Sequence, residues 1–109
     1  MEQSIKELIQ QEITAISNLP LDNNYSFVIN MICHHVHGEG GKLITSGMGK
    51  AGHIANNIAM TFSSTGTPAM YLHPSEAQHG DLGILQENDV LLVLSNSGKI
   101  HQITWSRVF

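Results

Sequence analysis

The 109-residue sequence predicts an α/β fold, a doubly wound parallel sheet of which this chain holds the first three strands. Two observations support this prediction. A stretch of apolar or β-branched residues at 43–45 runs through Ser46 into a glycine turn, and from Lys50 the apolar residues recur with helical period. The segment 90–94 is an uninterrupted apolar run, which is typical of a parallel strand covered on both faces. With a short strand at 69–72 between them, right-handed crossovers predict the strand order 2-1-3.

Two helices are predicted before the sheet. Ser4 and Glu7 form a capping box, and apolar residues at helical spacing extend a first amphipathic helix to about Asn18. Asp22 caps a second helix, which stops near Gly38. Its predicted apolar face consists of Phe27, Val28, Met31, Ile32 and Val36.

The central helix is predicted from about Lys50 to Ser64, and Gly66-Thr67-Pro68 breaks it. The residues expected to face the sheet are Ile54, Ile58 and Phe62, with Ala51, Ala55 and Ala59 allowing close packing. The segment 75–83 is expected to form a polar loop or a single helical turn. The spacing after residue 99 predicts the start of another helix.

Composition excludes several classes of function. Five Lys and Arg against nine Asp and Glu, with a formal net charge of -4, exclude the basic surface of a nucleic-acid-binding protein. No apolar run is long enough to cross a bilayer and the N-terminus lacks a signal-peptide core, so we expect a cytoplasmic protein with no membrane partner. We expect one domain over 1–109, with helices over 1–38 and a partial α/β core over 42–109.

The predicted strand order has a consequence for ligand binding. In the order 2-1-3, the carboxyl ends of strands 1 and 3 border the crevice in which ligands of such sheets bind. The turns at 46–50 and 95–98 both open into this crevice. Backbone N–H groups and the positive end of a helix suit an anion, so the sequence predicts a phosphorylated small molecule as the ligand.

A dinucleotide site is the alternative ligand-binding hypothesis. Gly47, Gly49 and Gly52 satisfy the pattern G-x-G-x-x-G. That motif requires an acidic residue at the end of the second strand to hold the ribose hydroxyls, and here the strand ends in Tyr71-Leu72-His73. We therefore favour the phosphorylated small molecule. A Walker A loop is excluded because no G-K-[ST] follows at the required spacing.

Three further segments stand out over roughly residues 42–98: SGMGKAGHIANNIA, STGTPAMYLHPSEAQHGDLGIL and NDVLLVLSNSG. In these segments the sequence resembles a known family, the SIS (sugar isomerase) domain, in the branch of arabinose-5-phosphate isomerases typified by KpsF and GutQ. The resemblance implies a flavodoxin-like, Rossmann-like three-layer α/β/α fold. It also implies aldose–ketose isomerisation of D-ribulose 5-phosphate and D-arabinose 5-phosphate through an enediol, at the entry to Kdo synthesis for lipopolysaccharide.

Such an isomerase needs a base beside the carbonyl, a donor for the enediolate and an anchor for the phosphate. The resemblance gives catalytic roles to Lys50 and His79, and an ammonium at the helix start would stabilise negative charge on the sugar oxygens. The alternative for Lys50 is a solvated lysine. The substrate-binding residues that the resemblance and the two turns indicate are Ser46, Gly47, Gly49, Gly66, Thr67, His73, His79, Ser95, Asn96, Ser97 and Gly98.

Metal binding is a separate question, because histidine and cysteine are common zinc ligands. By resemblance His73 is able to bind a zinc ion, although the implied reaction requires no cofactor. Cys33 and His37 form an i, i+4 pair, but two ligands from one helix do not close a zinc site. Glu76 and Asp81 share the loop with His79. The alternative to a functional role for these two residues is that they cap the turn or hold its backbone. His53 and His101 are expected at the surface.

Some positions depart from the family pattern. Ala51 stands where relatives commonly have serine, and Gln102 stands near the place of a catalytic glutamate and cannot act as a base. A complete domain of this type would continue through two more strands, so we expect the first part of an isomerase, with little or no turnover by itself. The alternatives are a sugar-phosphate sensor without catalysis and a phosphoheptose isomerase.

The expected partners follow from the same resemblance. They are a phosphorylated pentose and further copies of the chain, in a dimer or tetramer, because sites of this family lie near subunit contacts. The unpaired outer edge of the strand at 90–94 also favours association.

Overall fold

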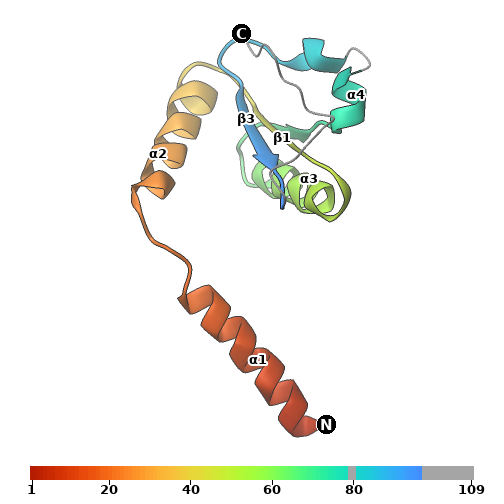
Figure 1. The fold of residues 1–109 in the computed structure, drawn as a ribbon. Helices are drawn as coiled ribbons and strands as arrows, with labels where there is room; N and C mark the ends of the chain where they lie inside the picture. Colours follow the sequence, from red (N-terminus) through yellow and green to blue (C-terminus); the bar gives the residue numbers. More distant parts are fainter. Residues whose placement is uncertain (79–80, 97–109) are drawn as a thin grey trace.

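The computed structural model describes residues 1–78 and 81–96, and its α/β core confirms the predicted strand order (Figure 1). β1 (Leu43–Gly47), β2 (Ala69–Tyr71) and β3 (Val90–Leu94) form a parallel sheet in the order β2-β1-β3. Leu43 pairs with Ala69 on one side and with Val90 on the other. Because all three strands run in the same direction, their carboxyl ends lie at one edge of the sheet.

The helices lie close to their predicted positions. They are α1 (Glu2–Ser17), α2 (Asn23–Ile32), which continues as a π-helix (Cys33–Gly38), α3 (Gly49–Ser64) and α4 (Pro74–Gln78), followed by a 3₁₀ turn (Asp81–Ile84). The predicted helix after residue 99 lies outside the described residues. A membrane-spanning segment needs about 18 or more mostly apolar residues in one helix, and the helices of the described residues do not meet that requirement.

The two predicted N-caps have different outcomes. The Asp22 cap of α2 is confirmed, because the Asn24 N–H donates to Asp22 Oδ1 at 2.9 Å. The capping box of Ser4 and Glu7 is wrong, since α1 begins at Glu2 after Met1 and has no side-chain cap. Glutamate and glutamine are good helix formers, and with an acidic residue in the first turn the helix extends past Ser4.

Side chains of the central strand point alternately to two core clusters. Leu43 packs with Val36 and Val90, beside Phe62 of α3. Its neighbour Ile44 packs on the opposite face with Leu72, Ala77 and Leu85. Thr45, on the same face as Leu43, donates its hydroxyl to the Ala55 carbonyl oxygen of α3 at 2.6 Å. The sheet is therefore covered by α3 on one face and by α4 with the 3₁₀ turn on the other.

Small residues decide how α3 meets the sheet. Gly52, Ala55 and Ala59 are its buried residues, which confirms the alanine packing predicted at 55 and 59. The predicted burial of Ile54 is wrong, because its side chain is 54% exposed. Three small residues at helical spacing bring the helix axis close to β1, and this contact turns Ile54 toward solvent.

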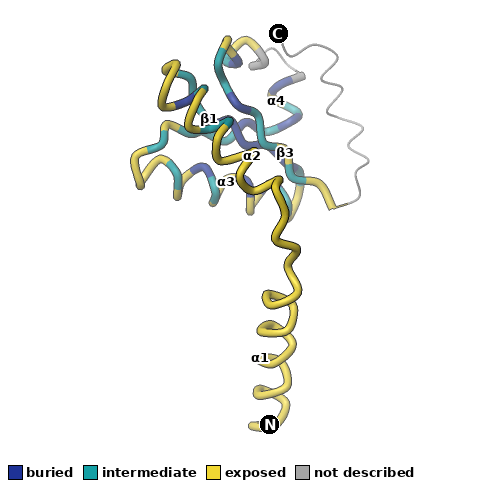
Figure 2. The backbone as a smooth tube through the Cα atoms, turned by 90° about the vertical axis from the view of Figure 1, so that its left-hand side faces the viewer, coloured by how far each residue is buried: buried dark blue, intermediate teal, exposed yellow. Residues whose placement is uncertain are grey.

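The N-terminal helices make few contacts with this core. α1 has no buried residue and extends away from the α/β body (Figures 1 and 2). On α2 the apolar face is only partly covered, since Phe27 and Val28 are exposed while Val36 of the following π-helix is buried. No described element covers Phe27 and Val28, so this part of the predicted apolar face is exposed.

The amino ends of β1 and β3 are joined by a mostly buried ion pair. Lys42 Nζ lies 2.7 Å from Asp89 Oδ2, and the side chains are 28% and 5% exposed. The Lys42 N–H donates to Asp89 Oδ1, and the Gln86 N–H donates to Asp89 Oδ2, both at 2.9 Å. One carboxylate therefore holds the segments that enter two neighbouring strands.

Candidate functional site

The turn between β1 and α3 is built to expose backbone N–H groups. Gly49 has φ of 59°, a conformation that favours glycine, and a Cβ there would meet open space. α3 has no side-chain N-cap, and the Gly52 N–H donates to the Met48 carbonyl oxygen at 3.2 Å. The N–H groups that precede Gly52 in the helix have no acceptor one turn back. Together with the helix dipole, they favour an anion at this turn.

Lys50 is the second residue of α3 and is exposed. It makes no ion pair with any residue in the described part of the chain. An ammonium group beside unpaired N–H groups increases the positive charge at the turn. The position therefore fits the predicted contact with an anionic sugar, and its catalytic role stays a prediction.

The end of β3 lies beside this turn, as the predicted crevice requires. Gly47 and Leu94 are register partners, so Ser95 and Asn96, which follow β3 directly, come next to the residues that follow Gly47. Both Ser95 and Asn96 are exposed. Ser97 and Gly98 lie outside the described residues, and their predicted phosphate contacts stay predictions.

Ser46 has a different place from the one expected for a phosphate ligand. It is fully buried, and its hydroxyl donates to the Leu72 carbonyl oxygen at 2.5 Å. Alternation along the strand directs Ser46 to the face opposite Thr45, toward the end of β2. In this structure the Ser46 hydroxyl connects two strand ends and does not point into the crevice.

His73 follows β2 at the same edge of the sheet and is held by the next turn. The Ser75 N–H and the Ser75 hydroxyl lie 3.1 and 2.7 Å from His73 Nδ1. A backbone N–H can only donate, so Nδ1 must carry a lone pair, and a neutral ring then has its proton on Nε2. His79, the second predicted sugar-binding histidine, lies outside the described residues.

This arrangement does not fit the predicted zinc ion. A zinc ligand must offer a lone pair, and the only lone pair of the neutral His73 ring already accepts the Ser75 N–H. Among residues 1–78 and 81–96, no three His, Cys, Asp or Glu side chains lie close enough together to hold a metal ion. No step of the reaction is therefore assigned to a zinc ion at His73.

Gly66 and Thr67 lie at the other end of the sheet. They precede β2, and the neighbouring Pro68 carbonyl accepts the N–H of Leu43, the first residue of β1. Thr67 Oγ1 lies 3.0 Å from His37 Nε2 in the π-helix. Residues before and after a parallel strand lie at opposite ends of the sheet, so one chain does not bring Gly66 and Thr67 to the Gly49 turn. The strand direction alone could have indicated this.

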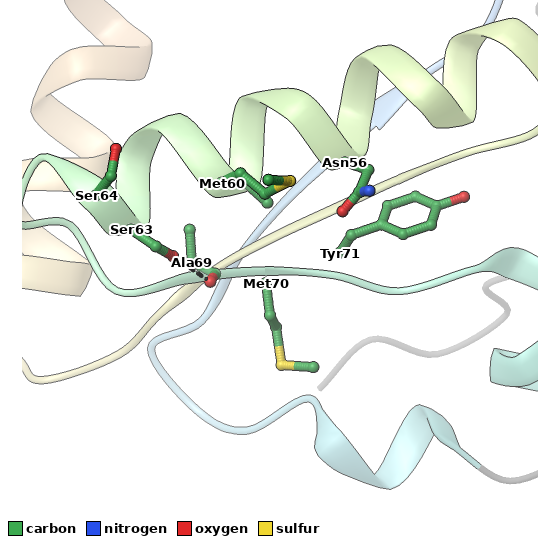
Figure 3. A pocket seen from close by; sticks show the side chains of 8 residues that line it. Asn56, Met60, Ser63, Ser64, Ala69, Met70 and Tyr71 are labelled. Atoms are coloured by element: carbon green, nitrogen blue, oxygen red, sulfur yellow. Dashed lines mark hydrogen bonds between the residues drawn. The ribbon is translucent and has the colours of Figure 1, made fainter.

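A groove of about 510 Å³ lies between α3 and the outer edge of β2 (Figure 3). Ser63 Oγ donates to the Ala69 carbonyl oxygen at 2.6 Å inside it. The bond occupies one acceptor of the free strand edge, which limits pairing with another strand. At the far end of the groove stands Tyr71, whose hydroxyl reaches the Gly47 carbonyl oxygen at 2.7 Å. The sequence-based prediction gives Tyr71 no role. Gly52 could have indicated this contact, because a glycine inside a helix often marks the close approach of another part of the chain.

Comparisons with known proteins agree with this geometry. The family model that matches the chain is the SIS domain, over residues 38–106. The chain belongs to the SIS domain family. The match begins at the end of the π-helix and includes the sheet, α3 and both turns described above.

Individual relatives are longer than this SIS chain. It is 42% identical over 103 residues to arabinose 5-phosphate isomerase KdsD of Shigella flexneri, covering 94% of this chain and 31% of that protein. The chain is also similar to a crystal structure of a candidate phosphosugar isomerase involved in capsule formation, from Bacteroides fragilis NCTC 9343. The TM-score is 0.90 and the identity 59%, and the match covers 94% of this chain and 54% of that chain. The structure of an Escherichia coli CFT073 protein in complex with arabinose 5-phosphate matches with a TM-score of 0.78 and 36% identity. This match covers 93% of this chain and 53% of that chain.

Proposed function

We propose that this chain is the phosphosugar-binding part of a cytoplasmic SIS isomerase that interconverts D-ribulose 5-phosphate and D-arabinose 5-phosphate, at the entry to Kdo synthesis. The observation that carries the proposal is the uncapped start of α3 beside the end of β3, within a SIS fold. The arabinose 5-phosphate complex of the Escherichia coli relative supports the same ligand. The relatives named arabinose 5-phosphate isomerase support the reaction.

In this proposal the sugar phosphate binds with its phosphoryl group at the Gly47–Gly49 turn. N–H groups at the start of α3 and the Lys50 ammonium hold the phosphoryl oxygens, while Ser95 and Asn96 close the other side. Isomerisation moves a proton between C1 and C2 through an enediolate, whose negative charge a nearby cation stabilises. Lys50 is the described residue suited to that task.

His73 is proposed to orient the sugar. Its Nδ1 is occupied by Ser75, so Nε2–H is the group left to donate to a sugar oxygen. A donor fixed in this way selects one orientation of the substrate hydroxyls. The proton transfer itself is assigned to His79, which the sequence resemblance indicates.

Ligand binding tests the proposal directly. We expect D-arabinose 5-phosphate to raise the melting temperature of the 109-residue chain, and unphosphorylated D-arabinose to leave it unchanged. Equal effects of the two sugars would show that the phosphate is not recognised. A larger effect of sedoheptulose 7-phosphate would favour a phosphoheptose isomerase instead.

Lys50→Gln tests the cation at the turn, and Lys6→Gln is its matched control, an exposed lysine near the start of α1. We expect Lys50→Gln to weaken binding of arabinose 5-phosphate by roughly tenfold, since a hydrogen bond to a charged group is worth about 1.5–3 kcal/mol. Lys6→Gln should leave binding unchanged. A direct assay should show little or no conversion of ribulose 5-phosphate, and a fast rate would contradict the expected inactivity.

We also propose that α1 and α2 bind a second copy of the chain. Isolated helices of this length are marginal in water, and no element of the described part of the chain buries a residue of α1. Ten large apolar side chains between Ile5 and Ile29 are at least half exposed. At roughly 60–120 Å² for a full side chain, they offer roughly 300–600 Å² of apolar area. A stable interface buries about 800 Å² per partner, somewhat over half of it apolar.

Light scattering of Ile9→Asp/Ile13→Asp tests this surface. We expect the wild-type chain to be a dimer or tetramer and the double variant to be monomeric, because the charges fall on the exposed face of α1. Glu12→Gln, on the same helix, should leave the mass unchanged. A wild-type chain that is monomeric at all concentrations would contradict the proposal.

A further inference from the structure

His73 is bound by the first turn of α4, which follows it directly. Pro74 has no N–H, so the Ser75 N–H is the first donor of that helix, and it donates to His73 Nδ1 at 3.1 Å. The His73 carbonyl oxygen accepts the N–H groups of Glu76 and Ala77 at 3.0 and 3.1 Å. The imidazole and the backbone of one residue therefore both satisfy N–H groups at the start of α4.

The Ser75 side chain makes a second and closer contact with the same ring nitrogen. Its hydroxyl oxygen lies 2.7 Å from His73 Nδ1. A hydroxyl can donate or accept, but a backbone N–H can only donate, so the N–H determines that Nδ1 carries a lone pair. The hydroxyl then donates to that lone pair as well, and in a neutral ring the proton lies on Nε2. One serine thus supplies two donors that favour one tautomer of the imidazole.

The imidazole also lies close to the glycine turn. The ring centroids of His73 and Tyr71 are 6.3 Å apart and their planes meet at 86°, an edge-to-face arrangement. The Tyr71 hydroxyl reaches the Gly47 carbonyl oxygen at 2.7 Å, and Figure 3 shows this hydroxyl directed toward the N-terminal end of α3. One aromatic ring therefore separates the imidazole from the turn. His73 is half-buried, and among the described side chains and N–H groups none is bonded to its Nε2.

We propose that Ser75 is a positioning residue for His73: its two donors hold the imidazole in the Nε2–H tautomer, so that the ring offers a donor to a sugar oxygen and favours a sugar phosphate over phosphate alone. The inference rests on the proposed function, in which the phosphoryl group binds at the glycine turn and His73 contacts the sugar. Ser75 itself does not touch the ligand. Without its hydroxyl the ring gains freedom to rotate, and the ligand must then order it on binding.

Ser75→Ala tests the hydroxyl, because it removes this donor and keeps the N–H. Ser64→Ala is the matched control, the same change at an exposed serine of α3 whose hydroxyl bonds to the backbone of its own helix. The probes are inorganic phosphate and D-arabinose 5-phosphate. In Ser75→Ala the Kd for arabinose 5-phosphate should rise roughly fivefold, because one hydrogen bond that fixes the imidazole is lost, and the Kd for phosphate should stay unchanged. Ser75→Thr, which keeps a hydroxyl, should restore wild-type binding, and Ser64→Ala should bind as the wild type does.

The ring ¹⁵N signals test the tautomer itself. In chain labelled with ¹⁵N-histidine, at a pH where imidazole is neutral, we expect His73 to show an unprotonated Nδ1 and a protonated Nε2. The variant His73→Gln identifies these signals among those of the seven histidines. In Ser75→Ala the Nδ1 signal should move, since the lone pair loses its closer donor.

Each other outcome has a separate meaning. A protonated Nδ1 in the neutral wild-type ring overturns the inference, while the proposed function stands. If Ser75→Ala raises the Kd of both probes equally, or of neither, Ser75 is only structural and the inference is overturned. Equal affinity of the wild type for the two probes also overturns it, because the sugar is then not recognised. If the wild type binds neither probe, the proposed function fails and the inference fails with it.

Discussion

The ion pair between Lys42 and Asp89 allows the most direct test of how the core is held. Asp89 accepts three hydrogen bonds: one N–H reaches Oδ1, and the Lys42 ammonium with another N–H reaches Oδ2. In Asp89→Asn one of these oxygens becomes an NH₂ group, which faces donors and cannot accept from them. The substitution preserves shape and removes both the charge and an acceptor.

The magnitude follows from burial. The Asp89 side chain is 5% exposed, and removing one partner of a buried pair costs about 3–5 kcal/mol because the other charge stays uncompensated. That is a large share of the roughly 5–15 kcal/mol by which a domain is stable. The Lys42 ammonium keeps one hydrogen bond, to the Ile84 carbonyl oxygen at 3.0 Å, so we expect the lower part of this range.

Glu2→Gln is the matched control. Glu2 and Lys6 form the same kind of pair at 3.3 Å, but their side chains are 85% and 66% exposed, and such a pair contributes at most a few tenths of a kcal/mol. Urea unfolding followed by circular dichroism gives the free energy of unfolding of both variants. A loss in Asp89→Asn that is within about 0.5 kcal/mol of the control would refute the reasoning.

The pH dependence adds a second measurement. Burial by itself would raise the pKa of Asp89, but hydrogen bonds from the Lys42 ammonium and two N–H groups, with the Lys42 charge, hold it below its ordinary value of 3.8. A lowered pKa in the folded state means that the stabilisation is present above pH 3.8 and is lost as the pH falls through the folded pKa. The difference in stability between wild type and Asp89→Asn should therefore shrink below pH 3.8.

Three further predictions concern the site. Ser46→Ala should lower the free energy of unfolding by about 1–3 kcal/mol, because the buried Leu72 carbonyl loses its donor. The control, Ser17→Ala at an exposed serine, should change the free energy of unfolding by less than about 0.5 kcal/mol. Equal losses for the two variants in urea unfolding would contradict the assigned role of Ser46. Gly49→Ala should lower the free energy of unfolding by roughly 1 kcal/mol more than Gly83→Ala, since a Cβ has room at both sites but only Gly49 has positive φ. Calorimetry that finds no difference between the two variants would contradict this account of the turn. Burial raises the pKa of Tyr71 above 10.0, so the contribution of the neutral phenol to stability is complete below pH 10 and is lost as the pH rises through the folded pKa. Tyr71→Phe should abolish this alkaline loss of stability. If the loss persists in the variant, the phenol is excluded as its cause.

The strands, their order and the glycine turn could be predicted because each depends on residues that are near in sequence. An all-apolar run such as 90–94 specifies a buried parallel strand, and a turn rich in glycine specifies a sharp bend before a helix. Right-handed crossovers then leave few possible orders. The prediction is wrong where two elements meet: spacing alone places Ile54 in the core, but the small residues of α3 set which face of that helix touches the sheet.

Residues that are neighbours in the chain specify the fold family, the edge of the sheet at which the polar turns gather and the anion-binding character of one turn. Which side chains hold these elements in place depends on contacts between parts that are far apart in the chain. Ser46 faces Leu72, Tyr71 faces Gly47, and Lys42 faces Asp89 across 47 positions of sequence. A hydrogen bond requires atoms within about 3 Å, and strand register and helix placement decide that distance.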